Sequence, residues 1–189
     1  MRAIALSVLL LGLAGTASAF DASRLDYSIM AGYAKPVGGN WAKDYRSSPF
    51  FGAGVEYNTG TEFRWGLEVG YNTGHEHKVV TKYDPGMLFI APYLKEYRFY
   101  DSWEYYAQIG VGLYHRVSPE YTDAGVTYEG GLSGKLGANG GLGFSYYLAE
   151  GFKVGIDLRV HHAIEFLGIG PEMASATNFT PSLTLSKKF

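Results

Sequence analysis

FRWGLEVGYN, residues 63–72, alternates an apolar side chain with a small or polar one at every position. Successive side chains of a strand point to opposite faces, so Trp65 and Leu67 share one face and Arg64 and Glu68 the other. About ten residues of such alternation is also the length that a tilted strand needs to cross a bilayer. The stretch therefore predicts a strand with one lipid-facing wall and one polar wall.

Counting this stretch, seven clear runs and one weaker run alternate in the same way along the chain. The weaker run contains Pro92, which cannot donate to a β ladder and predicts a local bulge or irregular pairing. The eight predicted strands are residues 25–35, 50–58, 63–72, 87–97, 103–116, 135–148, 152–162 and 179–189.

The connections between these runs alternate in length. Three are tight turns with the expected Gly, Asn, Asp or Ser chemistry, at residues 58–61, 100–102 and 149–151. Four are longer segments, at residues 36–49, 73–86, 117–134 and 163–178. This order predicts an all-β domain, an eight-stranded antiparallel up-and-down transmembrane β-barrel with short periplasmic turns and long extracellular loops.

A soluble barrel with its apolar face inward, as in a lipocalin, would show the same alternation. Three observations favour the membrane. The polar face is rich in glycine instead of surface charge, and the apolar face carries rings such as Trp65 and Phe144 that are too bulky for an eight-stranded interior. Aromatic residues also gather near the ends of the apolar rows, as in the girdles at the two headgroup layers.

The N-terminus has the pattern of a cleaved secretory signal peptide. Arg2 gives a positive start, residues 4–13 are apolar but too short for a spanning helix, and the triplet 17–19 (Ala-Ser-Ala) is a small-residue cleavage site. The sequence thus predicts a signal peptide at residues 1–19 and one barrel domain at residues 20–189. It contains no cysteine, so neither a lipoprotein anchor nor a disulfide is expected.

Composition narrows the class of partner. The formal net charge is −2, or about −3 without Arg2, which is too small to predict a nucleic-acid partner. The 26 glycines and 16 tyrosines suit strands and membrane interfaces better than helices. The glycines of residues 137–143 lie within a strand pattern and open no helix, so no phosphate-binding loop is predicted. Neither a cofactor nor a resident metal is expected.

Charged side chains on the polar faces are the most informative polar set. Charges inside a narrow barrel are costly unless they are paired, so four acidic and six basic residues are predicted to form a network that fills the lumen. The predicted network comprises Glu56, Arg64, Glu68, Lys95, Glu104, Lys135, Lys153, Asp157, Arg159 and Lys188. Such a barrel would be plugged or would carry at most a tiny pore.

The C-terminus carries a recognisable pattern, because Leu183, Leu185 and the terminal Phe189 share one face. They resemble the assembly signal of bacterial outer-membrane β-barrels, and residues 20–189 as a whole resemble the small outer-membrane β-barrel family of the OmpA-transmembrane, OmpX and OmpW kind. The resemblance implies insertion into a Gram-negative outer membrane by the barrel assembly machinery, in contact with outer-membrane lipids and lipopolysaccharide. Lys187 departs from the pattern, and we expect it to snorkel to headgroups at the rim.

Two adjacent histidines raise the alternative of an enzyme. Lipid A deacylases of the PagL type use a histidine, a serine two residues later and a glutamate as a triad. Here Ala163 and Ile164 stand two residues after His161 and His162, so the nucleophile is missing. We expect His161 to join the lumen network and His162 to lie at the outer rim.

Two features of the long segments suggest binding. The His-Glu-His sequence at 75–77 puts two imidazoles on one side of an extended chain, but a metal site would need a third ligand, so a solvated loop is the simpler interpretation. Trp41, Tyr45, Tyr121 and Tyr128 are aromatic residues of the kind that bind proteins or glycans, or that lean on lipid headgroups.

These observations predict a non-enzymatic integral outer-membrane protein with a charge-filled narrow lumen and four loops for surface contact or envelope integrity. A narrow channel for small solutes, as in OmpW-type barrels, is the first alternative, and a lipid A-modifying enzyme is the second. The lumen charges count against the channel and the missing serine against the enzyme. No external partner of the loops follows from the sequence.

Overall fold

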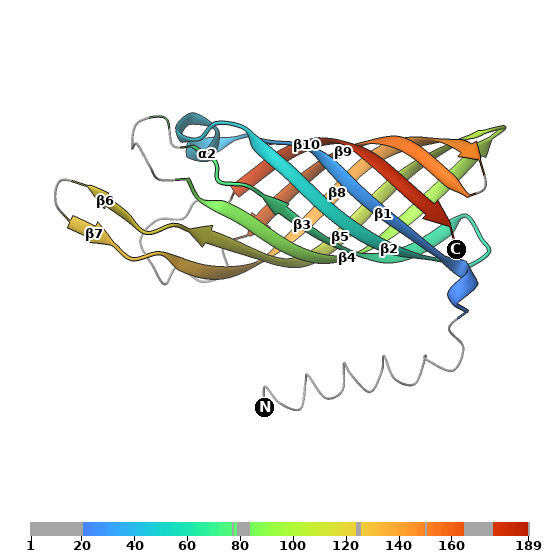
Figure 1. Cartoon of the computed structure of the whole chain (residues 1–189), viewed down its shortest axis with the longest axis horizontal. Helices are drawn as coiled ribbons and strands as arrows, with labels where there is room; N and C mark the ends of the chain where they lie inside the picture. The colour runs from blue at the N-terminus through green and yellow to red at the C-terminus, as the bar shows by residue number, and fades with distance from the viewer. Residues whose placement is uncertain are drawn as a thin grey trace, which may run out of the picture.

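The computed structural model describes residues 21–76, 78, 84–123, 126–149, 151–164 and 176–188. Eight strands close into one antiparallel barrel in the order β1-β10-β9-β8-β5-β4-β3-β2 (Figure 1). They are β1 (Leu25–Pro36), β2 (Ser48–Asn58), β3 (Phe63–Asn72), β4 (Gly86–Tyr100), β5 (Trp103–Ser118), β8 (Gly131–Ala149), β9 (Phe152–Ile164) and β10 (Ala176–Lys188). The predicted eight-stranded barrel is confirmed, while the predicted signal peptide lies outside the described residues.

The first and last strands of the barrel pair with each other and close the circle. The β1–β10 ladder runs from Asp26 opposite Lys188 to Pro36 opposite Asn178. A closed circle leaves no free strand edge, so the backbone N–H and C=O groups of the wall bond to one another. This closure lets strands lie in hydrocarbon, where no water is present to satisfy those groups.

Side-chain exposure is inverted relative to that of a soluble protein. Residues of β3 alternate between exposed and buried without a break from one end of the strand to the other. On the outer wall, Ile109 and Val111 are 68% and 65% exposed, whereas Glu68 inside the barrel is 1% exposed. Apolar side chains exposed in this way around a whole barrel would be unfavourable in water, so the outer wall faces lipid.

The end of the barrel with the three tight turns, named here the turn end, also holds the start of β1 and the end of β10 (Figure 1). A short 3-10 helix, η2 (Ala22–Arg24), precedes β1 there. Gly60, Asp101 and Gly151 have positive φ angles of 81°, 53° and 82° in the turns. Glycine enters this region without a Cβ clash and aspartate tolerates it, so these are the residue types that such turns need.

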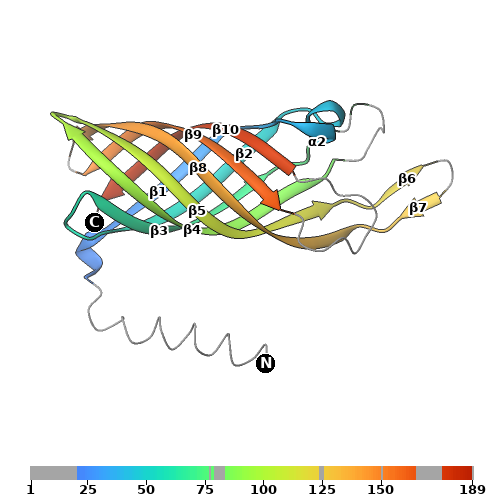
Figure 2. The same cartoon turned by 180° about the vertical axis from the view of Figure 1, so that it is seen from behind.

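The opposite end, named here the loop end, carries the long connections. They contain α2 (Gly39–Asp44) and a hairpin of β6 (Tyr121–Asp123) and β7 (Val126–Tyr128). The hairpin projects beyond the other strands in both views (Figure 1, Figure 2). Because the β5–β8 ladder continues to Ser118 opposite Gly131, the hairpin is the tip of a long two-stranded ribbon, which the alternation did not predict.

Pro92 interrupts one ladder without shifting it. In the β4–β5 pairing, Ile90 lies opposite Leu113 and Tyr93 opposite Gly110, with the two residues between them unassigned. The register is the same on both sides of the gap, so the structure has the irregular pairing that the proline predicted and not a bulge. Pro92 lies opposite Leu67 in the uninterrupted ladder with β3.

Candidate functional site: the barrel interior

Aromatic rings fill much of the interior, and several lie over glycines of the neighbouring strand. Tyr93 of β4 is paired with Gly66 of β3, where a Cβ atom would lie 2.5 Å from the tyrosine ring. Tyr106 of β5 lies over Gly143 of β8 in the same way. A ring and a second side chain cannot share this space. The glycines of the polar face therefore make room for rings from adjacent strands.

Six charged side chains meet in the half of the lumen nearest the turn end, and we call them the charge layer. Each comes from a different strand, and all six are buried. They are Asp26 on β1, Glu56 on β2, Arg64 on β3, Lys95 on β4, Glu104 on β5 and Lys153 on β9. Three are acidic and three are basic, so the formal charges of the layer cancel.

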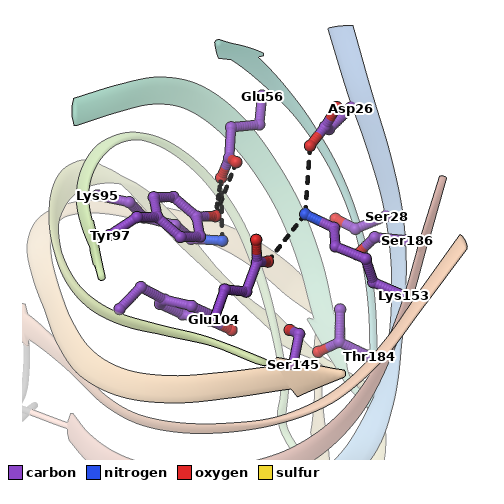
Figure 3. Close-up of a pocket in the computed structure, with 11 residues that line it drawn as sticks. Asp26, Ser28, Glu56, Lys95, Tyr97, Glu104, Ser145, Lys153, Thr184 and Ser186 are labelled. Atoms are coloured by element: carbon purple, nitrogen blue, oxygen red, sulfur yellow. Dashed lines mark hydrogen bonds and ion pairs between the residues drawn. The ribbon is translucent and has the colours of Figure 1, made fainter. Parts of the chain in front are cut away.

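Opposite charges alternate along the layer, beginning at the pair of Lys95 and Glu56 that Figure 3 shows. Lys95 Nζ lies 3.1 Å from Glu56 Oε2, and Glu56 Oε1 lies 3.2 Å from Arg64 Nη1. The same arginine nitrogen lies 3.2 Å from Asp26 Oδ2. The Tyr97 hydroxyl donates to Glu56 Oε1 at 2.7 Å, and the Arg64 guanidinium lies 4.1 Å from the centre of the Tyr97 ring. Each charge thus has an opposite charge or a ring beside it.

Lys153 extends the chain of alternating charges to its other end (Figure 3). Its Nζ lies 3.2 Å from Asp26 Oδ2 and 2.9 Å from Glu104 Oε1. The Tyr147 hydroxyl donates to the second oxygen of Glu104 at 2.8 Å. Removing one member of such a buried set leaves its partners as uncompensated buried charges. This costs far more free energy than breaking an exposed ion pair does. The charge layer is therefore stable as a complete set.

Little space is left between these side chains. A cavity of about 20 Å³ lies within the charge layer, and the hydroxyl residues Ser145 and Thr184 help to line it (Figure 3). A cavity of this size has room for about one water molecule. The cavity in the charge layer can therefore hold a single water molecule.

A second buried group lies around Arg159 and is named here the Arg159 set. The guanidinium of Arg159 forms ion pairs with Glu68 and Asp157, and all three side chains are at most 3% exposed. Its Nη2 also lies 3.5 Å from the sulfur of Met30. Glu68 is on β3 and Arg159 on β9, which are opposite each other in the strand order. The Arg159–Glu68 pair therefore bridges the lumen from wall to wall.

Nearer the loop end the lumen is filled by rings, which we call the aromatic layer: Phe50, Phe89, Tyr114 and His161. The ring centre of Phe89 lies 6.2 Å from that of Phe50, 5.2 Å from that of Tyr114 and 4.6 Å from that of His161. All four side chains are at most 2% exposed. Smaller apolar residues complete this cluster, among them Met30, Met87, Ala34, Ala91 and Ala163.

A hydrogen-bond chain joins the aromatic layer to the middle of the barrel. Gln108 Nε2 donates to Asn139 Oδ1 at 3.2 Å, and Asn139 Nδ2 donates to the Tyr114 hydroxyl at 3.3 Å. Tyr114 lies 3.2 Å from His161 Nδ1. Since the tyrosine oxygen accepts from Asn139, its hydrogen is available for the imidazole nitrogen. His161 is held inside the lumen by this contact and by the rings around it.

Eight of the ten charges predicted for the lumen network are buried in the structure: Glu56, Arg64, Glu68, Lys95, Glu104, Lys153, Asp157 and Arg159. Lys135 is half-buried near the loop end, and Lys188 is exposed at the turn end. The structure thus divides the predicted network between the charge layer and the Arg159 set and leaves two lysines outside both. Asp26 was missed, although it lies two residues before Ser28 on the same face of β1.

The histidine pair does not form a complete hydrolase site among the described residues. His161 is enclosed by the other rings of the aromatic layer, and Ala163, two residues further along β9, offers no nucleophile. His162 Nδ1 lies 2.8 Å from the Thr177 hydroxyl on β10, but no described carboxylate contacts this imidazole. Across all the residues that the structure describes, no three His, Cys, Asp or Glu side chains gather in a way that could hold a metal ion.

His75 is buried at the loop end, where it joins two long connections. Its Nδ1 lies 2.8 Å from the Arg46 carbonyl oxygen, and its Nε2 lies 3.4 Å from the Ser48 hydroxyl. Because a carbonyl oxygen can only accept, Nδ1 carries the hydrogen. Burial lowers the pKa of His75 below its usual value. His77, the other histidine of the suggested metal site, is outside the described residues.

Acid is expected to loosen this packing. A histidine that is harder to protonate when packed stabilises the packing fully above its free pKa of about 6.5, and that stability falls by at most about 1.4 kcal/mol per pH unit below it. Amide exchange of Arg46, whose N–H donates to the Glu76 carbonyl, should lose protection between about pH 7.5 and about pH 5.5 after correction for intrinsic rates. A His75→Gln variant should show no such change, and an equal loss in both proteins would contradict the assignment.

The exposed aromatic residues suggested for binding are only partly described. Tyr45 is half-buried at the loop end, where its hydroxyl accepts a long hydrogen bond of 3.5 Å from Arg116. The side chains of Trp41, Tyr121 and Tyr128 lie outside the described part of the structure. Their role in binding stays a prediction.

Comparison with known proteins identifies the family. A family model described as "Outer membrane protein beta-barrel domain" matches residues 5–186. Neisserial surface protein A has a similar structure, with a TM-score of 0.64 and 14% identity over 90% of this chain and 100% of that chain. No curated protein sequence matches this chain.

Two further solved structures are similar. Ail of Yersinia pestis, in complex with the heparin analogue sucrose octasulfate, has a TM-score of 0.52 and 15% identity, covering 88% of this chain and 99% of its own. The N-terminal barrel domain of OprF from Pseudomonas aeruginosa has a TM-score of 0.51 and 16% identity, covering 88% of this chain and 98% of its own. At such identities the likeness shows the fold alone.

Proposed function

This chain belongs to the outer-membrane protein beta-barrel family of Gram-negative bacteria, and from that premise we propose that it is a non-enzymatic, closed barrel that acts through its loop end. In this arrangement the turn end faces the periplasm and the loop end faces the cell exterior. The observation that carries the proposal is the filled lumen. Two buried groups of paired charges and one layer of rings occupy it between the turn end and the loop end.

The ribbon formed by β5, β6, β7 and β8 is the main element proposed for surface contact. It projects farthest from the barrel in both views (Figure 1, Figure 2). Glu120 and Glu129 are exposed beside the hairpin strands, and the hydroxyls of Thr122 and Thr127 bond to each other at 3.1 Å across them. A paired ribbon is stiffer than a loop, so it presents its tip at a fixed distance from the membrane. That property suits contact with another surface.

Membrane partners form the second part of the proposal. Lipids contact the outer wall, and we assign lipopolysaccharide to the part of that wall nearest the loop end. Leu183 and Leu185 are exposed on the outer face of β10, where the barrel assembly machinery would bind them. Phe189, the last residue of the proposed assembly signal, is outside the described residues.

Replacing residues 119–130 by a short glycine-containing turn tests the functional role of the ribbon. Ser118 and Gly131 are paired, so the turn joins strands that already lie side by side. We expect the variant to fold, shown by an unchanged heat-dependent shift in gel mobility, and to lose adhesion of intact cells to polystyrene or to one another. Unchanged adhesion would contradict surface contact through this ribbon.

Outer-membrane permeability separates the two roles left open for the loops. If they maintain envelope integrity, uptake of a hydrophobic fluorescent dye by cells should rise in the ribbon variant while adhesion stays the same. If they make surface contact, adhesion should fall while dye uptake stays at the level of the parent strain. A variant that changes neither would remove the support for both roles.

A further inference from the structure

One cation on the outer wall at the turn end has no acidic partner among the described residues. Lys187 faces outward near the end of β10, and its Nζ lies 5.0 Å from the ring centre of Phe152 on β9. Arg98, another outward cation at the same end, forms ion pairs with both Glu62 and Glu96. Of these two cations, Lys187 is therefore the one that is available to an anionic group at the membrane surface.

Two apolar hollows lie in the outer wall just inside the membrane from Lys187. The first has a volume of about 470 Å³ and is lined by Trp103, Phe144, Tyr146, Val154, Ile156 and Leu183. The second has a volume of about 420 Å³ and is lined mainly by Ile29, Ala31, Phe51, Val154, Leu183 and Leu185. Because Val154 and Leu183 line both, the hollows lie side by side across strands β9 and β10.

The cation and the hollows lie along one line of the wall. Leu185 and Leu183 precede Lys187 by two and four residues on the same face of β10, which places them about 7 Å and about 13 Å from it along the strand. Lys187 is paired with Phe152, and Leu185 with Val154, in the β9–β10 ladder. Moving into the membrane from the rim, the wall thus offers a cation first and then two apolar hollows.

We propose that this part of the wall binds one anionic phospholipid, with its phosphate at Lys187 and one acyl chain in each hollow. The charge of Lys187 complements a phosphate, and the apolar lining excludes a polar occupant. Trp103 and Tyr146, whose ring centres are 4.8 Å apart, border the site at the rim, where amphipathic rings favour the headgroup layer. Because the turn end faces the periplasm in the proposed orientation of the barrel, this lipid would belong to the periplasmic leaflet. Only this choice of leaflet rests on the proposed function.

Quenching of Trp103 by lipids with brominated acyl chains tests the site. The chain has three tryptophans, so the variant Trp41→Phe, Trp65→Phe keeps Trp103 as the single probe. It is reconstituted in phosphatidylcholine vesicles that contain brominated phosphatidylglycerol or brominated phosphatidylcholine. We expect an association preference of about fivefold for the anionic lipid, which is the effect of one cation at a membrane surface.

Two lysine variants locate the preference. Lys187→Gln in the Trp103 background should bring the ratio for the two brominated lipids close to one. Lys188→Gln is the matched control, because it removes the same charge from the next residue, on the other face of the strand. A variant that keeps only Trp65, which lies opposite Leu94 on β4, reports the outer wall four residues from the paired Arg98 along that strand and should show no preference for the anionic lipid.

The possible results separate the occupants. A preference that is lost in Lys187→Gln and kept in Lys188→Gln supports the phospholipid site. Equal quenching by both lipids in the parent, or a preference that survives Lys187→Gln, overturns it. If neither lipid quenches Trp103 while both quench Trp65, a second copy of the chain covers the hollows, and the proposal is wrong. Adhesion of the ribbon variant bears on none of these results, so the two proposals fail independently.

Discussion

Replacing Glu56 by glutamine is expected to lower the free energy of unfolding of the barrel by about 3–5 kcal/mol. Lys95 then loses the carboxylate that lies 3.1 Å from its Nζ, and Arg64 loses one of its two acidic partners. The Tyr97 hydroxyl keeps an acceptor in the glutamine oxygen, so the cost falls mainly on the stranded charges. Urea unfolding of the protein in phospholipid vesicles, followed by tryptophan fluorescence, measures the change.

The exposed pair of Glu62 and Arg98 provides the control. Both side chains are about 60% exposed, so Glu62→Gln removes the same charge in a solvated setting. It should cost less than about 1 kcal/mol. If the Glu56 and Glu62 variants lose the same small amount, the charge layer does not hold the barrel together, and its order in the structure has no energetic consequence.

Adding a side chain at Gly70 is expected to have a comparable effect through sterics alone. A Cβ atom there would lie 2.6 Å from Phe89 Cε1 and 2.7 Å from Phe50 Cε2, so Gly70→Val forces two packed rings to move. Overpacking of this kind costs about 1–3 kcal/mol, and the upper end is expected where both rings are confined by the barrel wall. The same urea titration, together with the yield of refolded protein, measures it.

Two companion variants make the Gly70 result specific. Gly140→Val is the matched control, because a Cβ atom at Gly140 meets nothing closer than 3.6 Å and the residue lies on the outer wall. It should leave stability nearly unchanged. Phe89→Ala in the Gly70→Val background frees the space that valine needs, so the double variant should lose less stability than the two single variants added together. Losses that simply add would show that the two residues do not compete for the same volume.

Alternation predicted the strands, while the bulk of the apolar face, the glycine-rich polar face and the aromatic girdles predicted which face lies outside. In β3 every second residue is apolar and the same residues are exposed, as that prediction requires. The tight turns were predictable as well, since positive φ angles occur at Gly60, Asp101 and Gly151. Both signals depend only on residues that are close together in the sequence, so they can be recognised without a structure.

The pairing of the lumen charges was not predictable, because it depends on how the strands are staggered. Glu56 and Lys95 come from β2 and β4, and β3 lies between them in the barrel. A period of two tells which face a residue occupies but not its depth relative to a residue on a distant strand. The same reason explains why Lys188, on the correct face by alternation, lies exposed at the rim and outside the charge layer.

The tyrosines inside the lumen were missed for a chemical reason. Tyr114 of the aromatic layer, and Tyr97 and Tyr106 nearer the turn end, point into the lumen, yet tyrosines in such strands are ordinarily assigned to the membrane interface. The glycines opposite them were read as signs of a narrow lumen, whereas in the structure they are the spaces that admit the rings. A glycine on one strand beside an inward-facing aromatic residue on the adjacent strand is the signal that would have identified these rings.

Single-channel recording in a planar bilayer shows whether the lumen is closed. Purified protein whose folding is verified by its gel shift would be inserted and held at a constant voltage in concentrated potassium chloride. With the charge layer and the aromatic layer in place, we expect a flat baseline without stepwise openings. Stable, reproducible conductance steps from the folded protein would show a continuous path through both layers and contradict the account of the barrel as a closed support for its surface segments.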